Sequence, residues 1–179
     1  MLFRSSWGAV GATCNPVIAL TALKADPRTW ADRIREYAGA HPTATEMEIG
    51  WAMVKRLSIE AAALLEPAFE RYAGLNGRLS IQTDPVLYRD TAVLIEQATE
   101  FASLAPNMIV KIPVTAAGIE AFEEVTYRGV SINATVSFTV SQAVAVAEAV
   151  ERGLRRREAE GLDVSTMGPV CTKIGRAHV

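Results

Sequence analysis

The stretch Ile109-Val110-Lys111-Ile112-Pro113 places one lysine in the middle of a short run of β-branched residues. Such a run between helical patterns predicts a buried parallel strand. Side chains alternate between the faces of a strand, so Val110 and Ile112 should share one face and Lys111 should lie on the other. Two interpretations of the lysine stay open. Either it reaches solvent at the strand end, or burial keeps its amine neutral and able to form a Schiff base with a carbonyl.

The composition limits the classes of function. The chain has 179 residues, half of them apolar, and a net charge of −2, which suits one domain with a sizeable core. The charge gives no reason to expect nucleic acid as a partner. Cys14 and Cys171 lie far apart, which predicts reduced, buried thiols of a cytoplasmic protein. With only His41 and His178 as histidines, we expect neither a His-based triad nor a metal site.

Targeting and membrane signals point the same way. The first six residues have no long apolar core of the kind that a signal peptide needs. No apolar run of the sequence is long enough to span a bilayer. We therefore expect no membrane association.

Helical patterns alternate with four further strand-like segments. The predicted strands are 9–13, 78–83, 108–112, 130–136 and 167–172. This βα repeat predicts a parallel sheet, either an open doubly wound sheet or a (β/α)8 barrel. Neither a Gly-x-Gly-x-x-Gly motif nor a P-loop occurs, which weakens the nucleotide-binding versions of the open sheet.

Several residues predict where the helices begin and end. We expect a helix over 27–38 that Gly39 stops, a break at Pro67, and one continuous helix over 86–103. The predicted N-caps are Asn15, Thr43 or Thr45, Thr115, and Thr139 or Ser141.

Polar groups gather at the carboxyl ends of the predicted strands. In a barrel, these ends carry the chemistry. The residues there are Asn15, Gln82, Lys111, Asn133, Thr135 and Cys171. In the segment 130–137, polar and apolar residues alternate, namely Ser131, Asn133, Thr135 and Ser137 against Val130, Ile132 and Val136. The polar groups converge only if the sheet closes.

Four motifs resemble those of the transaldolase family, including its fructose-6-phosphate-aldolase-like branch. They occur in family order with family-like spacing, over most of residues 8–172. They are Gly11-Ala12-Thr13-Cys14-Asn15-Pro16, Leu79-Ser80-Ile81-Gln82-Thr83-Asp84, Ile109-Val110-Lys111-Ile112-Pro113-Val114-Thr115-Ala116-Ala117-Gly118-Ile119 and Gly129-Val130-Ser131-Ile132-Asn133-Ala134-Thr135. Together, the lysine motif and the following Asn-x-Thr are fairly specific to this family.

The resemblance implies a TIM (β/α)8 barrel that moves a dihydroxyacetone unit between sugar phosphates without metal or cofactor. It implies that Lys111 forms the Schiff base, that Asn133 and Asn15 bind substrate, and that Thr135 positions the catalytic water. Cys171, at the end of the last predicted strand, is a further expected substrate contact. Gln82 stands where many transaldolases have Glu and the aldolase-like branch has Gln. An amide cannot take a proton, so the acid–base role must belong to another residue. Transfer of the three-carbon unit and simple aldol cleavage therefore both stay open.

The βα pattern accounts for only part of a barrel. We count five to six βα units over 1–172 and expect an incomplete barrel that lacks the first strand, with its acid–base aspartate, and the last two. The family has an arginine for the substrate phosphate shortly after its sixth strand. Arg176 is a candidate for this arginine, but it lies one residue closer to Cys171 than the family spacing implies. The tail 173–179 reads like the translation of a sequencing adapter, so we expect it to be non-native.

Three functions follow as alternatives. The first is a transaldolase of the cytoplasmic pentose phosphate pathway, and the second is a metal-free fructose-6-phosphate-type aldolase. The third is a non-catalytic barrel relative or an inactive fragment. We expect the 179-residue chain by itself to be inactive. The sequence assigns neither the preferred sugar phosphate nor the oligomeric state.

Overall fold

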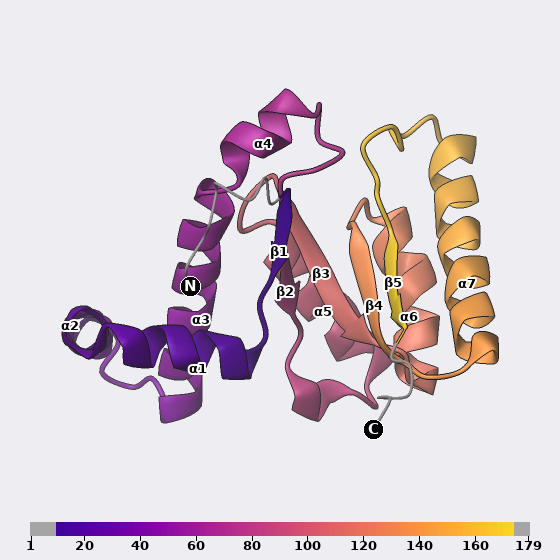
Figure 1. Cartoon of the computed structure of the whole chain (residues 1–179). Coiled ribbons are helices and arrows are strands. Elements are labelled where there is room, and N and C mark those ends of the chain that lie inside the picture. The colour runs from indigo at the N-terminus through magenta and orange to yellow at the C-terminus, as the bar shows by residue number, and fades with distance from the viewer. Residues whose placement is uncertain (1–9, 174–179) are drawn as a thin grey trace, which may run out of the picture.

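The structure, a computed structural model, describes residues 10–173 and is built around a parallel sheet. Five strands follow one another in the order β1-β2-β3-β4-β5, and every neighbouring pair is parallel. They are rich in β-branched residues, which favour extended backbone. The strands are β1 (Gly11–Thr13), β2 (Arg78–Gln82), β3 (Met108–Pro113), β4 (Ile132–Ser137) and β5 (Val170–Lys173) (Figure 1).

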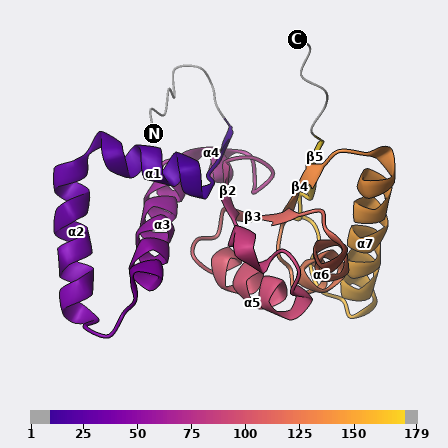
Figure 2. The ribbon, with the colours of Figure 1, turned by 90° about the horizontal axis from the view of Figure 1, so that it is seen from below.

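The strand order decides between the two predicted architectures. A doubly wound sheet reverses its strand order at a switch point, whereas a barrel adds strands sequentially around an axis. Seen nearly end-on, the five strands follow an arc with helices along its outer side (Figure 2). Residues 10–173 thus form part of a TIM (β/α)8 barrel, with β1 and β5 at the edges of the described sheet. This confirms the predicted incomplete barrel.

Seven α-helices and one short 3-10 helix connect the strands in the described residues. They are α1 (Pro16–Ala25), α2 (Pro27–Ala40), α3 (Glu46–Ala63), α4 (Glu66–Arg71), the 3-10 helix η2 (Pro85–Leu87), α5 (Thr91–Ala102), α6 (Ala116–Tyr127) and α7 (Val140–Ala159). None of the helices is long and apolar enough to cross a membrane, as far as the described residues extend.

The capping residues of three helices settle open alternatives or confirm predictions. Thr45, not Thr43, caps α3 in a capping box with Glu48. Thr139, not Ser141, caps α7 in a second capping box with Gln142. Thr115 caps α6 as predicted. Each box pairs a side chain with a backbone N–H that the first helical turn leaves without a partner.

Two helix predictions were wrong at their boundaries. Helix α2 runs through Gly39 to Ala40, because a helical glycine with open space around it weakens a helix without ending it. The segment 86–103 is not one helix. Asp84 caps η2, and a separate cap at Asp90 starts α5. An Asp side chain can accept a hydrogen bond from a backbone N–H shortly after it in the chain, which favours the start of a new helix there. Pro67 lies at the start of α4, after the predicted break.

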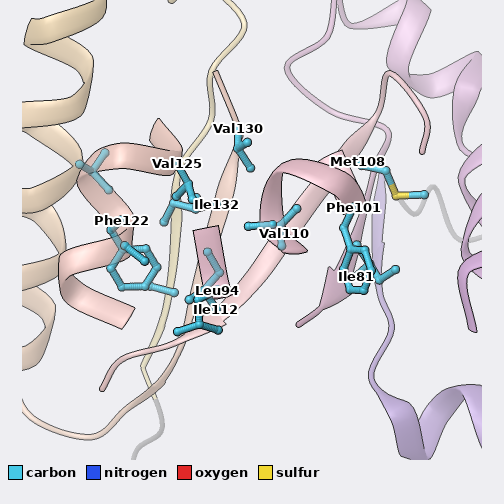
Figure 3. Packing of buried hydrophobic residues seen from close by; sticks show 14 of the residues in the cluster. Ile81, Leu94, Phe101, Met108, Val110, Ile112, Phe122, Val125, Val130 and Ile132 are labelled. Carbon is cyan, nitrogen blue, oxygen red and sulfur yellow. The ribbon is translucent and has the colours of Figure 1, made fainter. Parts of the chain in front are cut away.

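The core lies between the outer face of the sheet and the helices. The strand residues Leu79, Ile81, Val110, Ile112 and Ile132 are fully buried or nearly so. They pack against apolar side chains of α3, α5, α6 and α7, including Leu94, Phe101, Phe122 and Val125 (Figure 3). Val110 and Ile112 therefore share the outer face, as predicted, and Lys111 is left on the inner, concave face.

Strands β4 and β5 differ most from their predicted bounds. Strand β4 begins at Ile132 and extends to Ser137, and β5 begins only at Val170 and includes Lys173. The predicted tail therefore overlaps the described structure at Lys173 alone. Residues 174–179, with Arg176, lie outside the described residues.

Candidate active site

Three predicted site residues lie side by side on the concave face. Gln82 is the register partner of Lys111 on the neighbouring strand, and Lys111 is the register partner of Asn133. Register partners of parallel strands point to the same face of a sheet. Gln82 and Lys111 are partly buried, and Asn133 is buried. The lysine amine thus projects from a row whose two neighbours carry neutral amides.

Two hydroxyl groups hold the amide of Asn133. Asn133 Nδ2 donates to Ser80 Oγ at 3.1 Å, and Thr172 Oγ1 donates to Asn133 Oδ1 at 2.8 Å. With both ends engaged, the amide has one preferred orientation beside Lys111. The sequence analysis did not select Ser80 or Thr172. For Ser80 a signal was available, because it lies two residues before Gln82 and so on the same face.

Thr135 lies nearer the carboxyl ends of the strands. It is the register partner of Pro113, two residues beyond Lys111 on β3, and it is buried. Its backbone is held by Val114, whose N–H donates to the Thr135 carbonyl at 2.7 Å. The sheet therefore places Thr135 on the concave face, nearer the carboxyl ends of the strands than Lys111.

Asn15 reaches the same edge from β1. The backbone N–H of Cys14 donates to the Ser80 carbonyl at 2.7 Å, which extends the pairing of β1 with β2 up to Asn15. The Asn15 side chain caps α1, as predicted, because its Oδ1 accepts from the Ile18 backbone N–H at 2.8 Å. Its carbonyl oxygen is therefore engaged within the protein.

Cys171 does not join the other five residues. Its register partner is Ala134, whose methyl group belongs to the helix-facing core, so Cys171 lies on the outer side of the sheet. There it lines an apolar groove of about 290 Å³ beside Val146 and Val150 of α7. The prediction of a buried thiol was also wrong, since Cys171 is exposed. Its neighbour Thr172 contacts Asn133 instead.

Cys14 is a buried thiol within electrostatic reach of the lysine. Burial raises the pKa of the Cys14 thiol, while the Ser58 hydroxyl and the positive charge of Lys111 lower it in part. The net direction is upward, so the thiol stays protonated at neutral pH. The predicted burial is therefore confirmed for Cys14.

The carboxylate nearest to Gln82 in sequence, Asp84, is already engaged. Its Oδ2 accepts from Trp51 Nε1 at 3.2 Å, and its Oδ1 accepts from the Val86 backbone N–H at 3.0 Å. These bonds fit a structural role in the loop after β2. Across residues 10–173, no group of three or more His, Cys, Asp or Glu side chains is placed to hold a metal ion.

A hollow of about 240 Å³ continues the concave face toward the amino ends of the strands, lined by residues that include Ser80, Ile109 and Asn133. Arg78 is part of its wall and closes it. Its Nε donates to the Gly74 carbonyl at 2.9 Å, one terminal nitrogen donates to Ser131 Oγ at 3.2 Å, and the other contacts the Thr166 carbonyl. Burial lowers the pKa of this guanidinium. Arg78 thus connects the segments that contain Gly74, Ser131 and Thr166, and its donors bind protein groups rather than an anion.

The chain is similar to known proteins over most of its length. The sequence model of the family Transaldolase/Fructose-6-phosphate aldolase matches residues 3–169. A transaldolase of Thiobacillus denitrificans is 37% identical over 159 residues, which are 88% of this chain and 44% of the relative. Transaldolase 1 of Streptomyces avermitilis is 33% identical over 166 residues, 91% of this chain and 43% of the relative.

These relatives are much longer than the chain. A transaldolase of Mycolicibacterium smegmatis is 34% identical over 167 residues, again 91% of this chain but 44% of the relative. The chain thus spans less than half the length of the curated relatives that it matches. The match nevertheless includes every strand up to β4, with Gln82, Lys111, Asn133 and Thr135. The chain belongs to the transaldolase/fructose-6-phosphate aldolase family.

Proposed function

We propose that Lys111 is the Schiff-base nucleophile of a transaldolase that moves a dihydroxyacetone unit between sugar phosphates. The observation that carries this proposal is the row of Gln82, Lys111 and Asn133 on the concave face. It offers one amine flanked by neutral hydrogen-bonding groups, which suits a polyhydroxylated ketone. The alternative interpretation, a lysine that merely reaches solvent, gives no reason for two flanking amides.

In the proposed reaction, the neutral Lys111 amine attacks the ketose carbonyl and the resulting carbinolamine loses water. The iminium nitrogen then accepts the electron pair of the breaking carbon–carbon bond, while the departing aldehyde's hydroxyl gives up its proton. The enamine that remains holds the three-carbon unit and adds to an acceptor aldehyde. Hydrolysis of the product iminium frees the lysine. No metal is needed, because the iminium is the electron sink.

The neighbouring residues have distinct proposed roles. Asn133 holds the hydroxyls of the three-carbon unit, with its amide oriented by Ser80 and Thr172. Each such hydrogen bond contributes about 1 kcal/mol net. Thr135 positions the water that carries the proton, and the Asn15 amide nitrogen binds the substrate from β1. Thr172, rather than Cys171, serves the site from β5, because Cys171 lies on the other side of the sheet.

Gln82 favours a second candidate function, simple aldol cleavage without an acceptor sugar. An amide can orient water beside Lys111 but cannot take the proton, and Asp84 is engaged with Trp51 and Val86. The general base therefore has to come from another part of the protein. A third possibility is a barrel relative without turnover. For the first two functions we propose a cytoplasmic enzyme of sugar-phosphate metabolism, and for the transaldolase a place in the pentose phosphate pathway.

Borohydride trapping tests the proposal. Full-length protein is incubated with fructose 6-phosphate and borohydride, which reduces the iminium to a stable secondary amine, and is then mapped by mass spectrometry. We expect a three-carbon unit on Lys111 and its loss in Lys111→Arg. The other lysines, Lys24, Lys55 and Lys173, serve as internal controls. An adduct on one of these, or none at all, would reject the proposal.

The acceptor dependence separates the two enzymatic functions. Release of glyceraldehyde 3-phosphate from fructose 6-phosphate is followed with and without erythrose 4-phosphate. A transaldolase releases it over many turnovers only when the acceptor is present, because the three-carbon unit otherwise stays on Lys111. Equal release in both conditions would establish the aldolase. A Gln82→Glu variant that becomes more dependent on the acceptor would identify Gln82 as the deciding residue.

A further inference from the structure

Strand β4 contains one extra residue next to the proposed site. Ala134 is the register partner of Cys171 on β5, and Ser137 is the register partner of Lys173. Three steps along β4 thus correspond to two steps along β5. Such a β-bulge bends the strand and changes the direction of the side chains beside it.

The bulge reverses the predicted alternation of side chains. The sequence pattern predicted Ser137 on the polar face with Asn133 and Thr135, and Val136 on the apolar face. Instead Ser137 is fully buried and Val136 is 39% exposed. Because Ala134 and Ser137 are partners of Cys171 and Lys173 on the outer side, the extra residue leaves Thr135 and Val136 together toward the concave side.

The backbone at Val136 adopts a conformation that valine rarely takes. Its φ is +61°, in the left-handed region that is unfavourable for a β-branched side chain. Such a conformation persists only where surrounding contacts hold it. Just after Val136 the chain is fixed by the Gln142 side chain, whose Oε1 accepts from the backbone N–H groups of Phe138 and Thr139 and whose Nε2 donates to the Val114 carbonyl.

The position of Val136 relative to the lysine follows from the register. Thr135 and Pro113 lie two residues beyond Asn133 and Lys111 toward the carboxyl ends. Two residues of a strand cover about 6.6 Å, so Thr135 and Val136 lie between Lys111 and the carboxyl-end mouth of the concave face. A substrate that reaches Lys111 from this mouth, where barrel sites lie, would pass Thr135 and Val136.

We propose that the bulge makes Val136 a specificity-determining residue, whose isopropyl group forms an apolar wall for the part of a sugar phosphate beyond the three carbons held at Lys111. This inference rests on the proposed function. The wall faces the carbon backbone of the aldehyde portion and limits its width. The smallest ketone substrate, dihydroxyacetone, has no such portion and does not reach the wall.

Two substitutions test the bulge independently of any activity. At an ordinary strand position glycine is less stable than alanine, whereas at a positive φ glycine is favoured. We expect Val136→Gly to unfold roughly 2–4 °C higher than Val136→Ala, measured by thermal denaturation. Both variants remove the two Cγ methyl groups of Val136, and they differ by one Cβ methyl at a partly exposed position and in backbone preference. A lower midpoint for the glycine variant would overturn the bulge and the inference with it.

Borohydride trapping with two ketones tests the specificity. We expect Val136→Phe to reduce the trapping rate with fructose 6-phosphate at least tenfold, while trapping of dihydroxyacetone at Lys111 changes less than twofold. Val144→Ala, at an exposed position of α7, is the control and should change neither rate. Equal changes with both ketones would overturn the specificity role alone. Absence of any adduct in the unsubstituted protein would overturn the proposed function, and the specificity role with it.

Discussion

The two faces of β2, β3 and β4 are made from alternate residues of the same strands, yet they differ in polarity and in what they contact. The outer face carries Ile81, Val110, Ile112 and Ile132, all packed against helices. The concave face carries the row with Lys111, where amide and hydroxyl groups bond one another. Stability therefore depends mainly on one face, and the proposed chemistry depends on the other.

This separation follows from the period of two in a β-strand. A substitution on the outer face removes buried apolar contacts that no water can replace. At Gln82 or Lys111 on the concave face, a substitution removes a polar group from a partly exposed position. The two classes of variant should consequently affect different measurements, and the following predictions test how complete that separation is.

The largest expected effect comes from adjacent residues on opposite faces. Ile112→Ala should lower the free energy of unfolding by about 2–5 kcal/mol, because the fully buried side chain leaves a cavity among the helices. Lys111→Met should change it by less than about 1 kcal/mol, since a similar volume stays on the partly exposed face. Urea denaturation measures both. A similar loss in the two variants would show that the concave face also supports the fold.

A close approach of helix and strand gives the next effect. A Cβ atom on Gly118 of α6 would lie 1.9 Å from the carbonyl oxygen of Pro113, at the end of β3. Gly118→Ala should therefore destabilise the protein by about 1–3 kcal/mol or more.

The matched control for Gly118→Ala is Gly50→Ala in α3, where nothing lies within 4 Å of the added atom. There the helix preference of alanine should stabilise the protein by about 0.5–1 kcal/mol. Chemical denaturation of both variants gives the comparison. Two changes of the same sign would contradict the role of the Pro113 contact.

The Gln142 side chain connects the ends of the two central strands, and a single atom tests that connection. Gln142 Nε2 donates to the Val114 carbonyl at 3.0 Å. Gln142→Glu keeps the oxygen that accepts the capping hydrogen bonds but loses this donor. We expect a loss of about 1 kcal/mol, measured by chemical denaturation. Gln142→Ala removes both interactions and should cost more. If Gln142→Glu is as stable as the unsubstituted protein, the bond to Val114 contributes nothing.

The smallest effect lies on the outer surface between α6 and α7. A hydrogen bond from Arg152 lowers the pKa of Glu123, and one from Arg128 lowers that of Glu124, with Arg156 assisting both. Because the folded state favours the charged carboxylates, this stability is present above the ordinary carboxyl pKa and is lost as pH falls through the lowered values. Each pair should contribute about 0.5 kcal/mol.

Thermal denaturation between pH 7 and pH 3 measures the contribution of these pairs. A Glu123→Gln, Glu124→Gln double variant should lose less stability over that range than the unsubstituted protein. The difference should shrink in high salt, which screens exposed charges. An unchanged pH slope would assign the acid sensitivity to other carboxylates.

Local chemistry explains which parts of the fold were predictable. The segment 108–112 was predictable as a strand because a short run of β-branched residues favours extended backbone. The N-cap of α3 could be narrowed to Thr43 or Thr45, because each has a Glu three residues on. That of α7 could be narrowed to Thr139 or Ser141, because both have hydroxyl side chains that can cap a helix. Glycine and proline gave weaker signals: Gly39 did not end α2, since its surroundings leave it free to stay helical.

The candidate site was predictable in its members but not in its arrangement. Gln82, Lys111 and Asn133 could be selected as polar groups near strand ends, while Ser80 and Thr172 became visible only through their bonds to Asn133. Cys171 was expected to join the site because it lies at a strand end, but pairing with Ala134 places it on the outer side of the sheet. Register, which has a period of two, turns a shift of one residue into a change of face.

The sequence by itself determined the βα order, the lysine strand and the family motifs, because these depend on residue type and on spacing within short segments. Only the tertiary structure decided that the strands follow one another around an arc, that two amides flank Lys111, and that Thr135 and Val136 share a face. These features depend on pairing between strands far apart in the chain. The bulge at Val136 is the clearest case, since an extra residue is defined only relative to the neighbouring strand.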